Sequence, residues 1–305
     1  MNKLVILIFG LTLGLFSPPA ALAPVEKIAF DTCGYYEWGG YYSCYIQVAN
    51  VDGTGAVSLP AEATEPAWSP DGSRIAFSDL WGNGIYVWSA EDGTIVPLDT
   101  NYYYSGSPTW APDGQHIAFS SSVSGSMELY AWHADGTPVT QLTNQAGVRG
   151  GAAWSPDGTR IAFDCEIAAG NGDICALELS TGAITRLTTD SGSDSGPAWS
   201  PDGTRLAFGT MRFGGVSEIA VMNADGTAVA RLGSGIAGRL PAWSPNGNRI
   251  AFQTSGGPCD DYGFCLDVIY RVNVDGTGHT FFGYGFDAAW TESSAVFGRP
   301  TAYIS

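Results

Sequence analysis

Basic residues are scarce in this sequence of 305 residues, which has 13 lysines and arginines against 30 aspartates and glutamates and a formal net charge of −17 at pH 7. A surface of this sign repels nucleic-acid phosphates and anionic lipids, so we expect no nucleic-acid partner and no binding to anionic membranes. The charge suits either a basic partner or simple solubility outside the cell.

Long apolar runs are also nearly absent. The run at residues 4–16 is shorter than the roughly 20 residues that a membrane-spanning helix needs. Lys3 precedes this run, and Ala21 and Ala23 follow it at the spacing of a cleavage site, as in a secretory signal peptide. We therefore predict that residues 1–23 are a signal peptide. Residues 24–305 are then exported to the periplasm or the extracellular space, with no membrane span left after cleavage.

The sequence is rich instead in copies of one stretch, which is clearest at residues 197–208, Pro-Ala-Trp-Ser-Pro-Asp-Gly-Thr-Arg-Leu-Ala-Phe. The stretch returns around Trp68, Trp110, Trp154, Trp243 and, in altered form, Trp290. Successive tryptophans of the series are 42, 44, 45, 44 and 47 residues apart. A fixed period in the low forties is typical of a propeller-like array.

Each copy predicts a hairpin of two short strands. Pro-Ala-Trp is a short apolar strand, and Ser-Pro-Asp-Gly has the residues of a tight turn. In residues 74–77, Arg-Ile-Ala-Phe, apolar and other side chains alternate as they do in a second strand. A third alternating run, an Asp-Gly turn and a fourth short strand follow in most copies, so each unit is a four-stranded meander. One such sheet cannot bury both faces alone, and the units must therefore stack as propeller blades.

The two ends of the repeat array complement each other. Residues 27–30 begin the array at the second strand of a blade, and the last tryptophan lies in a first strand with no full blade behind it. We therefore predict one all-β domain at residues 24–305, a six-bladed propeller with blades from about 26, 65, 107, 151, 196 and 240. The strand at about 286–292, centred on 287–290, closes the ring by joining the N-terminal strands, which removes free sheet edges.

The cysteines and histidines indicate disulfides rather than a metal site. Each close cysteine pair brackets the loop between the second and third strands of one blade, so we predict the bridges Cys33–Cys44, Cys165–Cys175 and Cys259–Cys265. The Cys-x2-Cys spacing of zinc sites is absent. His116, His133 and His279 fall, by our assignment, in different blades and form no metal-ligand cluster.

The stretch Pro-x-Trp-Ser-Pro-Asp-Gly-x-x-Ile-Ala-Phe, followed by Asp-Gly-Thr and by Arg-Leu-Thr at 186–188, resembles the TolB-type, WD40-like (PD40) propeller repeat. The resemblance covers residues 26 to about 292 and implies the propeller fold. TolB carries an α/β domain before its propeller and binds protein partners in the cell envelope. The sequence leaves no room for that domain between Ala23 and Lys27, so we do not expect TolB itself.

Prolyl-oligopeptidase-like hydrolases are similar in this repeat, but they need a catalytic domain with a Gly-x-Ser-x-Gly elbow. That pentapeptide does not occur in the sequence. We also find no triad, phosphate-binding loop or other catalytic motif, so we predict that the protein is not an enzyme.

Aromatic residues gather in the loops that a propeller places on one face. These loops vary between blades, whereas the Asp-Gly turns on the opposite face are uniform, and variable loops on a rigid scaffold commonly bind ligands. The aromatic candidates are Tyr35, Tyr36, Trp38, Tyr41, Trp81, Tyr102, Tyr103, Tyr104, Tyr262 and Phe264. They suit recognition of a protein or a glycan, and the alternative is that the rings pack within their own loops.

Carboxylates are expected near the channel mouth on the same face. Asp31, Glu65 and Asp287 approach the channel from neighbouring blades, and Asp164 takes the position equivalent to Asp31 across the ring. The first three could hold Ca²⁺, attract a cationic group or remain solvated acids.

We therefore predict a monomeric, exported binding protein with a protein partner and no required cofactor. The alternatives are a glycan-binding module on the same face and, less favoured, a hydrolase or lyase that uses Asp31, Glu65 or Asp287.

Overall fold

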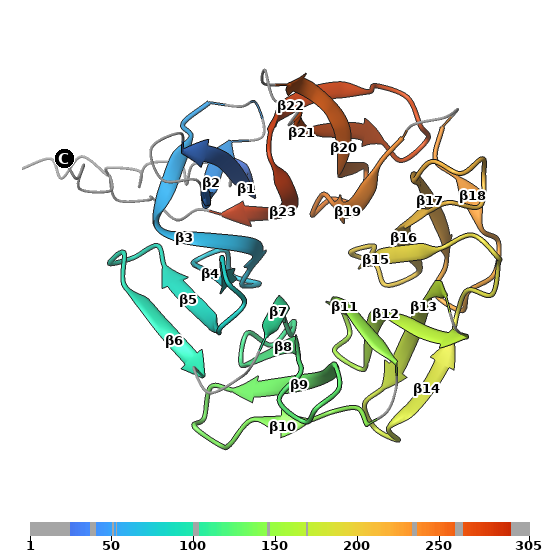
Figure 1. The fold of residues 1–305 in the computed structure, drawn as a ribbon, viewed down its shortest axis with the longest axis horizontal. Coiled ribbons are helices and arrows are strands. Elements are labelled where there is room, and N and C mark those ends of the chain that lie inside the picture. The colour runs from blue at the N-terminus through green and yellow to red at the C-terminus, as the bar shows by residue number, and fades with distance from the viewer. Residues whose placement is uncertain are drawn as a thin grey trace, which may run out of the picture.

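A computed structural model describes residues 25–36, 41–50, 52, 54–99, 104–144, 147–168, 170–233, 237–259 and 265–293. Every element in these ranges is a β-strand, and the strands form a ring of sheets around a central opening (Figure 1). No helix that could cross a membrane is found in the described part of the chain.

Four sheets have four strands each, and one sheet has seven. The seven-stranded sheet runs in the order β23 (Phe286–Ser293), β1 (Val25–Tyr36), β2 (Tyr41–Asn50), β3 (Val57–Trp68), β4 (Arg74–Asp79), β5 (Ile85–Ser89) and β6 (Ile95–Asp99). The next sheets contain β7 (Ser105–Trp110), β8 (His116–Ser121), β9 (Glu128–His133) and β10 (Thr140–Gln141), then β11 (Val148–Trp154), β12 (Arg160–Ala168), β13 (Asn171–Glu178) and β14 (Ala183–Arg186). The last two contain β15 (Asp194–Trp199), β16 (Arg205–Thr210), β17 (Glu218–Asn223) and β18 (Ala230–Arg231), then β19 (Arg239–Trp243), β20 (Arg249–Cys259), β21 (Cys265–Asn273) and β22 (Thr280–Tyr284).

The seven-stranded sheet is continuous because β3 has two antiparallel partners. Its first part pairs with β2, as in Val48↔Val57, and its second part pairs with β4, as in Trp68↔Ile75. At the other edge β23 pairs with β1, with Ile28 opposite Trp290. Among the described strands, the last thus lies beside the first, the closure expected from the two incomplete ends of the repeat. The architecture is a β-propeller of antiparallel, four-stranded blades.

The repeated apolar residues form the core between neighbouring sheets. The phenylalanine of each Ile/Leu-Ala-Phe segment is buried, and Phe163 and Phe208 are fully so. Trp199 is 7% exposed, and its Nε1 donates a hydrogen bond of 3.1 Å to the carbonyl of Ala153 in the preceding blade. The guanidinium of Arg160 lies 4.5 Å from the centre of the Trp199 ring, within cation–π range. The repeated tryptophans therefore anchor one blade to the next.

The repeated aspartates hold the tight turns. Asp202 Oδ1 accepts hydrogen bonds from Ser200 Oγ at 2.5 Å and from the backbone N–H of Thr204 at 3.0 Å. These hydrogen bonds, first that from Ser200, lower the pKa of Asp202 to about 2. Gly203 has φ of 69°, which favours glycine at that position. The spacing of these aspartates is therefore explained by turn geometry.

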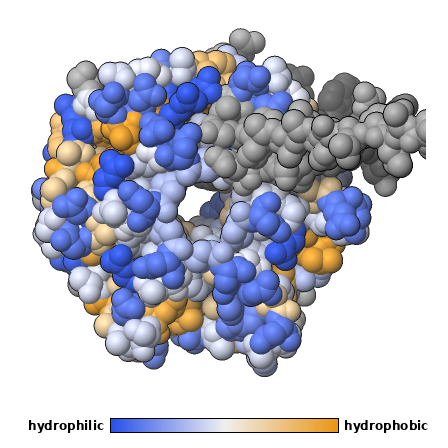
Figure 2. All heavy atoms as spheres, turned by 180° about the vertical axis from the view of Figure 1, so that it is seen from behind, coloured by the Kyte–Doolittle hydropathy of each residue, from blue (hydrophilic) through white to orange (hydrophobic). Residues whose placement is uncertain are grey.

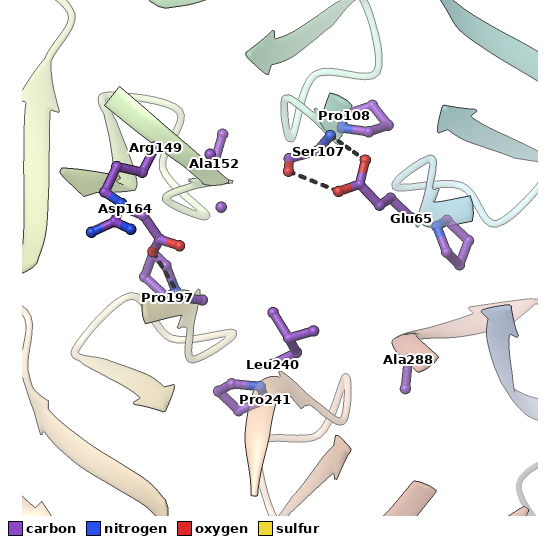
Figure 3. Close-up of a pocket in the computed structure, with 14 residues that line it drawn as sticks. Glu65, Ser107, Pro108, Arg149, Ala152, Asp164, Pro197, Leu240, Pro241 and Ala288 are labelled. Atoms are coloured by element: carbon purple, nitrogen blue, oxygen red, sulfur yellow. Dashed lines mark hydrogen bonds between the residues drawn. The ribbon is translucent and has the colours of Figure 1, made fainter. Parts of the chain in front are cut away.

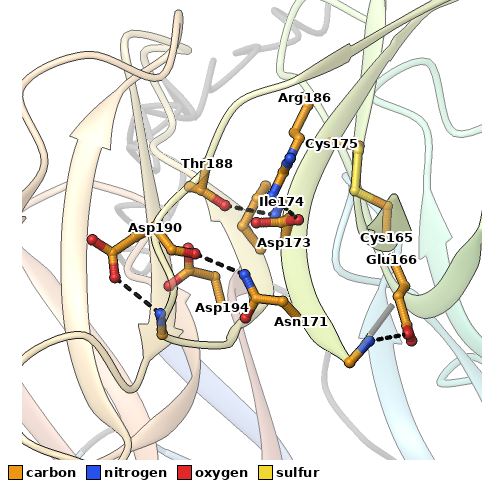
Figure 4. A network of polar contacts seen from close by, with 12 residues as sticks. Cys165, Glu166, Asn171, Asp173, Ile174, Cys175, Arg186, Thr188, Asp190 and Asp194 are labelled. Carbon is orange, nitrogen blue, oxygen red and sulfur yellow. Dashed lines mark hydrogen bonds and ion pairs between the residues drawn. A yellow bond between two sulfur atoms is a disulfide. The ribbon is translucent and has the colours of Figure 1, made fainter. Parts of the chain in front are cut away.

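The predicted disulfide Cys165–Cys175 is present and joins β12 to β13, with Cα atoms 5.9 Å apart (Figure 4). Cys44 is also disulfide-bonded and lies opposite Cys33 in the β1–β2 ladder. Cys259 lies opposite Cys265 between β20 and β21. The side chains of Cys33, Cys259 and Cys265 lie outside the described residues, so their bridges stay predictions.

Two buried acids, Asp173 and Asp194, lie to one side of this disulfide (Figure 4). Asp173 is fully buried and pairs with Arg186 at 2.7 Å, and Thr188 Oγ1 accepts the backbone N–H of Ile174 at 2.9 Å. In the next blade Asp194 pairs with Arg212 at 2.6 Å. Each of these buried carboxylates has an arginine partner, which accounts for its burial inside the sheets. The acids therefore do not indicate a binding site.

Candidate functional site

A ring of residues with left-handed backbone conformation lines the central channel. The residue three positions before each repeated tryptophan lies in the left-handed region wherever its φ is described. These residues are Glu65 (55°), Ser107 (52°), Gly151 (62°), Gly196 (63°) and Leu240 (52°). At each of them the ladder to the next strand shifts register, which is the geometry of a β-bulge. The bulges bring five innermost strands to the channel, a feature that the sequence analysis did not predict; a proline follows the bulge residue at four of them and Ala152 at the fifth.

These bulges enclose a cavity of about 400 Å³ at the channel. The opening is visible from the back of the molecule, rimmed mainly by hydrophilic and intermediate residues (Figure 2). Figure 3 shows Glu65 and Asp164 on opposite sides of it. Lining residues beyond the bulge positions include Arg149, Gly150, Asp164 and Ala288.

Glu65 bridges two blades at one side of the channel. Its Oε2 accepts hydrogen bonds of 2.7 Å from the backbone N–H of Ser107 and 2.7 Å from the hydroxyl of Ser78. Its Oε1 accepts a third, of 3.2 Å, from the hydroxyl of Ser107. Three donors from two sheets therefore fix this carboxylate.

Asp164 bridges two other blades at the opposite side with fewer donors. Its Oδ1 accepts a hydrogen bond of 2.7 Å from the backbone N–H of Gly196 in the next blade. A β-carbon on Gly151 would lie 2.7 Å from this carboxylate, so the carboxylate requires glycine there. Burial raises the pKa of Asp164 to about 7, although the Gly196 hydrogen bond and the charge of Arg149 oppose the rise.

A second cavity, of about 430 Å³, adjoins the first and shares Glu65 and Arg149 with it. Asp31, Asp79, Trp81 and Tyr104 also line it. The structure thus places Asp31 and Glu65 at one cavity, as expected from the sequence, and brings two of the predicted aromatic residues to the same place. Asp31 itself is buried, at 2% exposure.

Trp81 and Tyr104 are large apolar side chains that remain open to solvent, at 65% and 64% exposure. Trp81 lies in the loop between β4 and β5, and Tyr104 directly precedes β7. A β-carbon on Gly82 would lie 3.1 Å from the Tyr104 ring, which shows that the ring lies over that loop. The backbone N–H of Ser105 also donates to the carbonyl of Gly82 at 2.7 Å. The segments that carry Trp81 and Tyr104 therefore contact each other across two neighbouring blades.

The other predicted aromatic residues are not placed. Tyr35, Tyr36 and Tyr41 lie in β1 and β2, but their side chains are not described. The remaining members, Trp38, Tyr102, Tyr103, Tyr262 and Phe264, lie outside the described residues.

The calcium hypothesis for Asp31, Glu65 and Asp287 also stays a prediction. The Asp287 side chain is not described, so the trio cannot be assembled. Among the described residues, no three or more His, Cys, Asp or Glu side chains form a group that could hold a metal ion.

The placement of the histidines corrects the sequence analysis. His116 and His133 were assigned to different blades, but they lie directly opposite each other on β8 and β9 of one sheet. The assignment was wrong because the blade predicted from about 107 to about 151 already contains both residues, and β9 ends at His133, next to the Asp135-Gly136 turn. His279 is separate and stacks against Tyr270, with ring centres 4.4 Å apart.

Comparison with known proteins identifies the family. The model of the TolB β-propeller domain (PD40) matches residues 39–280. TolB from Acinetobacter baumannii is similar in structure, with a TM-score of 0.72 and 22% identity over 87% of this chain and 66% of that chain. This chain therefore spans about two thirds of the length of that TolB.

Two further solved structures share the fold. A putative TolB from Agrobacterium tumefaciens has a TM-score of 0.66 and 23% identity, covering 86% of this chain and 91% of that chain. A chain from a nidogen/laminin complex has a TM-score of 0.66 and 12% identity, covering 87% of this chain and 98% of that chain. No curated protein matches the sequence. The family match over most of its length shows that this chain belongs to the TolB β-propeller domain family.

Proposed function

We propose that this protein is a non-catalytic binding propeller, which recognises a protein partner through the face that carries Trp81 and Tyr104. The observation that carries this proposal is that Trp81 and Tyr104, from two neighbouring blades, are both open to solvent and line one cavity. Exposed tryptophan and tyrosine on a rigid frame give large contact areas at a small entropic cost, and such residues dominate the binding energy of many interfaces.

The charge around the aromatic pair favours a basic partner. Asp31, Glu65 and Asp79 line the same cavity, and Arg149 is the basic side chain among the described residues that line it. A net negative cavity attracts cationic groups and raises the rate at which a basic partner associates. The aromatic rim then supplies contact area, and the carboxylates supply selection by charge.

The number of blades and the location of the protein are also part of this proposal. We count the seven-stranded sheet as two blades that share β3, which with the other four sheets gives six. The Cys165–Cys175 disulfide and the TolB-like fold favour a location outside the cytoplasm. We propose export to the periplasm or the extracellular medium as a monomer, with no catalytic role.

Affinity capture tests the function. The exported, oxidised protein is immobilised and exposed to envelope and secreted extracts, beside a Trp81→Ala/Tyr104→Ala variant. A matched control variant changes Phe281 and Tyr284, which are 50% and 46% exposed on the edge strand β22. We expect the wild type and the control variant to capture a protein that the Trp81→Ala/Tyr104→Ala variant does not capture. Equal capture by all three forms contradicts the proposal.

A glycan ligand is the second candidate. The observation that favours it is the combination of an open tryptophan ring with carboxylates and the hydroxyls of Ser78, Ser105 and Ser107 around one cavity, since sugars present both apolar faces and hydroxyl groups. A glycan array decides between the candidates. Binding of a glycan that the Trp81→Ala variant loses supports this candidate, and a uniformly negative array removes it.

A further inference from the structure

We propose that His116 and His133 form a two-histidine site for a divalent transition-metal ion, on the side of the propeller opposite Trp81 and Tyr104. The sequence has three histidines, and the fold places two of them opposite each other on adjacent strands. This site is independent of the proposed partner-binding function.

The backbone pairing brings the two side chains close. Ala134 donates its N–H to the carbonyl of Gln115 at 2.9 Å, so the neighbouring pair, His116 and His133, is the non-hydrogen-bonded kind. Side chains of such pairs approach each other more closely than those of hydrogen-bonded pairs. The ring centres are 5.2 Å apart. A metal ion bonded to one nitrogen of each ring at about 2.0–2.1 Å can bridge this separation, because each nitrogen itself lies away from its ring centre.

Hydrogen bonds leave one nitrogen of each ring available. His116 Nδ1 lies 2.7 Å from Asp113 Oδ2, and an ionised carboxylate can only accept, so Nδ1 donates this hydrogen bond and, in the neutral ring, the lone pair is on Nε2. A carboxylate on the far side of a histidine is also the usual support of a metal ligand. His133 Nε2 lies 3.0 Å from Thr140 Oγ1, and a hydrogen bond donated there leaves the lone pair on His133 Nδ1.

Exposure and charge suit an ion that arrives from solvent. The His116 side chain is 38% exposed, and that of Asp113 is 50% exposed. Imidazole nitrogens favour Zn²⁺, Ni²⁺ and Cu²⁺ over Ca²⁺. Two protein ligands also leave coordination positions for water or for a side chain of another molecule.

The site is at the far end of its blade from the aromatic pair. His116 begins β8, directly after the turn at 111–114, whereas the backbone N–H of Ser122 at the other end of β8 donates to the carbonyl of Tyr104 at 3.2 Å. A metal ion at the histidine pair therefore leaves the proposed partner site open.

Isothermal titration with ZnCl2 tests the site, on the full chain exported by its host and purified without a histidine tag. We expect one Zn²⁺ site that CaCl2 does not displace. Its affinity falls about tenfold or more in His116→Ala and in His133→Ala, and about 10–100-fold in Asp113→Asn, which removes the support of a ligand. The third histidine gives a matched control, and His279→Ala keeps the wild-type affinity.

Glutamine variants at both positions, with thermal melting of each protein, separate a lost ligand from a lost fold. Weak Zn²⁺ binding by a variant that melts like the wild type supports the site. Zn²⁺ binding that survives in the His116→Gln/His133→Gln protein overturns it. So does an equal loss in His279→Ala, or a wild-type protein that binds no Zn²⁺.

Discussion

The two ends of the blades are built from the same strands but use their residues differently. At one end, each Ser-Pro-Asp-Gly turn repeats its contacts, as Asp202 shows with Ser200 and Thr204, and arginines stack on the next tryptophan. At the other end the loops differ from blade to blade, and Trp81 and Tyr104 lie open above a cavity. Repeated residues in this protein therefore stabilise the fold, whereas the candidate binding residues are those that depart from the repeat.

Two tryptophans sharpen this comparison most. Trp199→Ala removes a ring that is 7% exposed and hydrogen-bonded to the preceding blade, and we expect the free energy of unfolding to fall by about 3–5 kcal/mol. Trp81→Ala removes a ring that is 65% exposed, and we expect a change within about 0.5 kcal/mol. Urea unfolding measures both. Similar losses in the two variants would contradict the division of roles.

The disulfide gives the next largest effect. Cys165→Ser/Cys175→Ser opens a loop with a sequence separation of 10, and we expect a loss of about 2–3 kcal/mol in the chain-entropy account. Thermal melting with and without reductant measures this loss. Reductant should still destabilise the wild type more than the variant, and equal sensitivity would show that this bridge contributes nothing.

Asp164→Asn tests the channel end of the blades through pH. The asparagine oxygen can still accept the Gly196 N–H, but the titration is removed. An unfolded aspartate has a pKa of about 3.9, and the folded one has a pKa of about 7. The folded state therefore keeps a proton that the unfolded state loses, and the stability of the wild type relative to the variant falls as pH rises between these values. Parallel pH profiles of the two proteins would contradict this result.

Asp202→Ala tests the turn end with the smallest expected effect. It removes hydrogen bonds from Ser200 and Thr204 at an exposed turn, and we expect a loss of about 0.5–1.5 kcal/mol. Asp190, also exposed but outside the repeated turns, gives the matched control, since Asp190→Ala loses a single side-chain contact to Gly192. An Asp202 variant no less stable than the Asp190 variant would show that the repeated contacts add nothing.

Much of the fold could be predicted from the sequence because the signal is repeated. The tryptophan period and the Ser-Pro-Asp-Gly turns, seen several times, predicted the four-stranded antiparallel blades and the Cys165–Cys175 bridge. The channel bulges were missed because positive φ at Glu65, Ser107 and Leu240 contradicts the usual preference of those residue types.

The candidate site was predictable only in part. Asp31 and Glu65 were expected near one another, and the structure places both at one cavity with Trp81 and Tyr104. The pairing of His116 with His133 was missed because the register between the second and third strands of this blade decides it, and no motif in the sequence marks that register. The raised pKa of Asp164 depends on burial and on having one backbone donor, which no motif reveals.

The central claim is that the variable loops bind and the uniform turns do not. Hydrogen–deuterium exchange of the protein, alone and with the captured partner, tests it most directly. We predict slower exchange at residues 79–84 and 104–107 in the complex, with the turn at 200–205 unchanged. Protection confined to the turn at 200–205 and its repeats would contradict the claim.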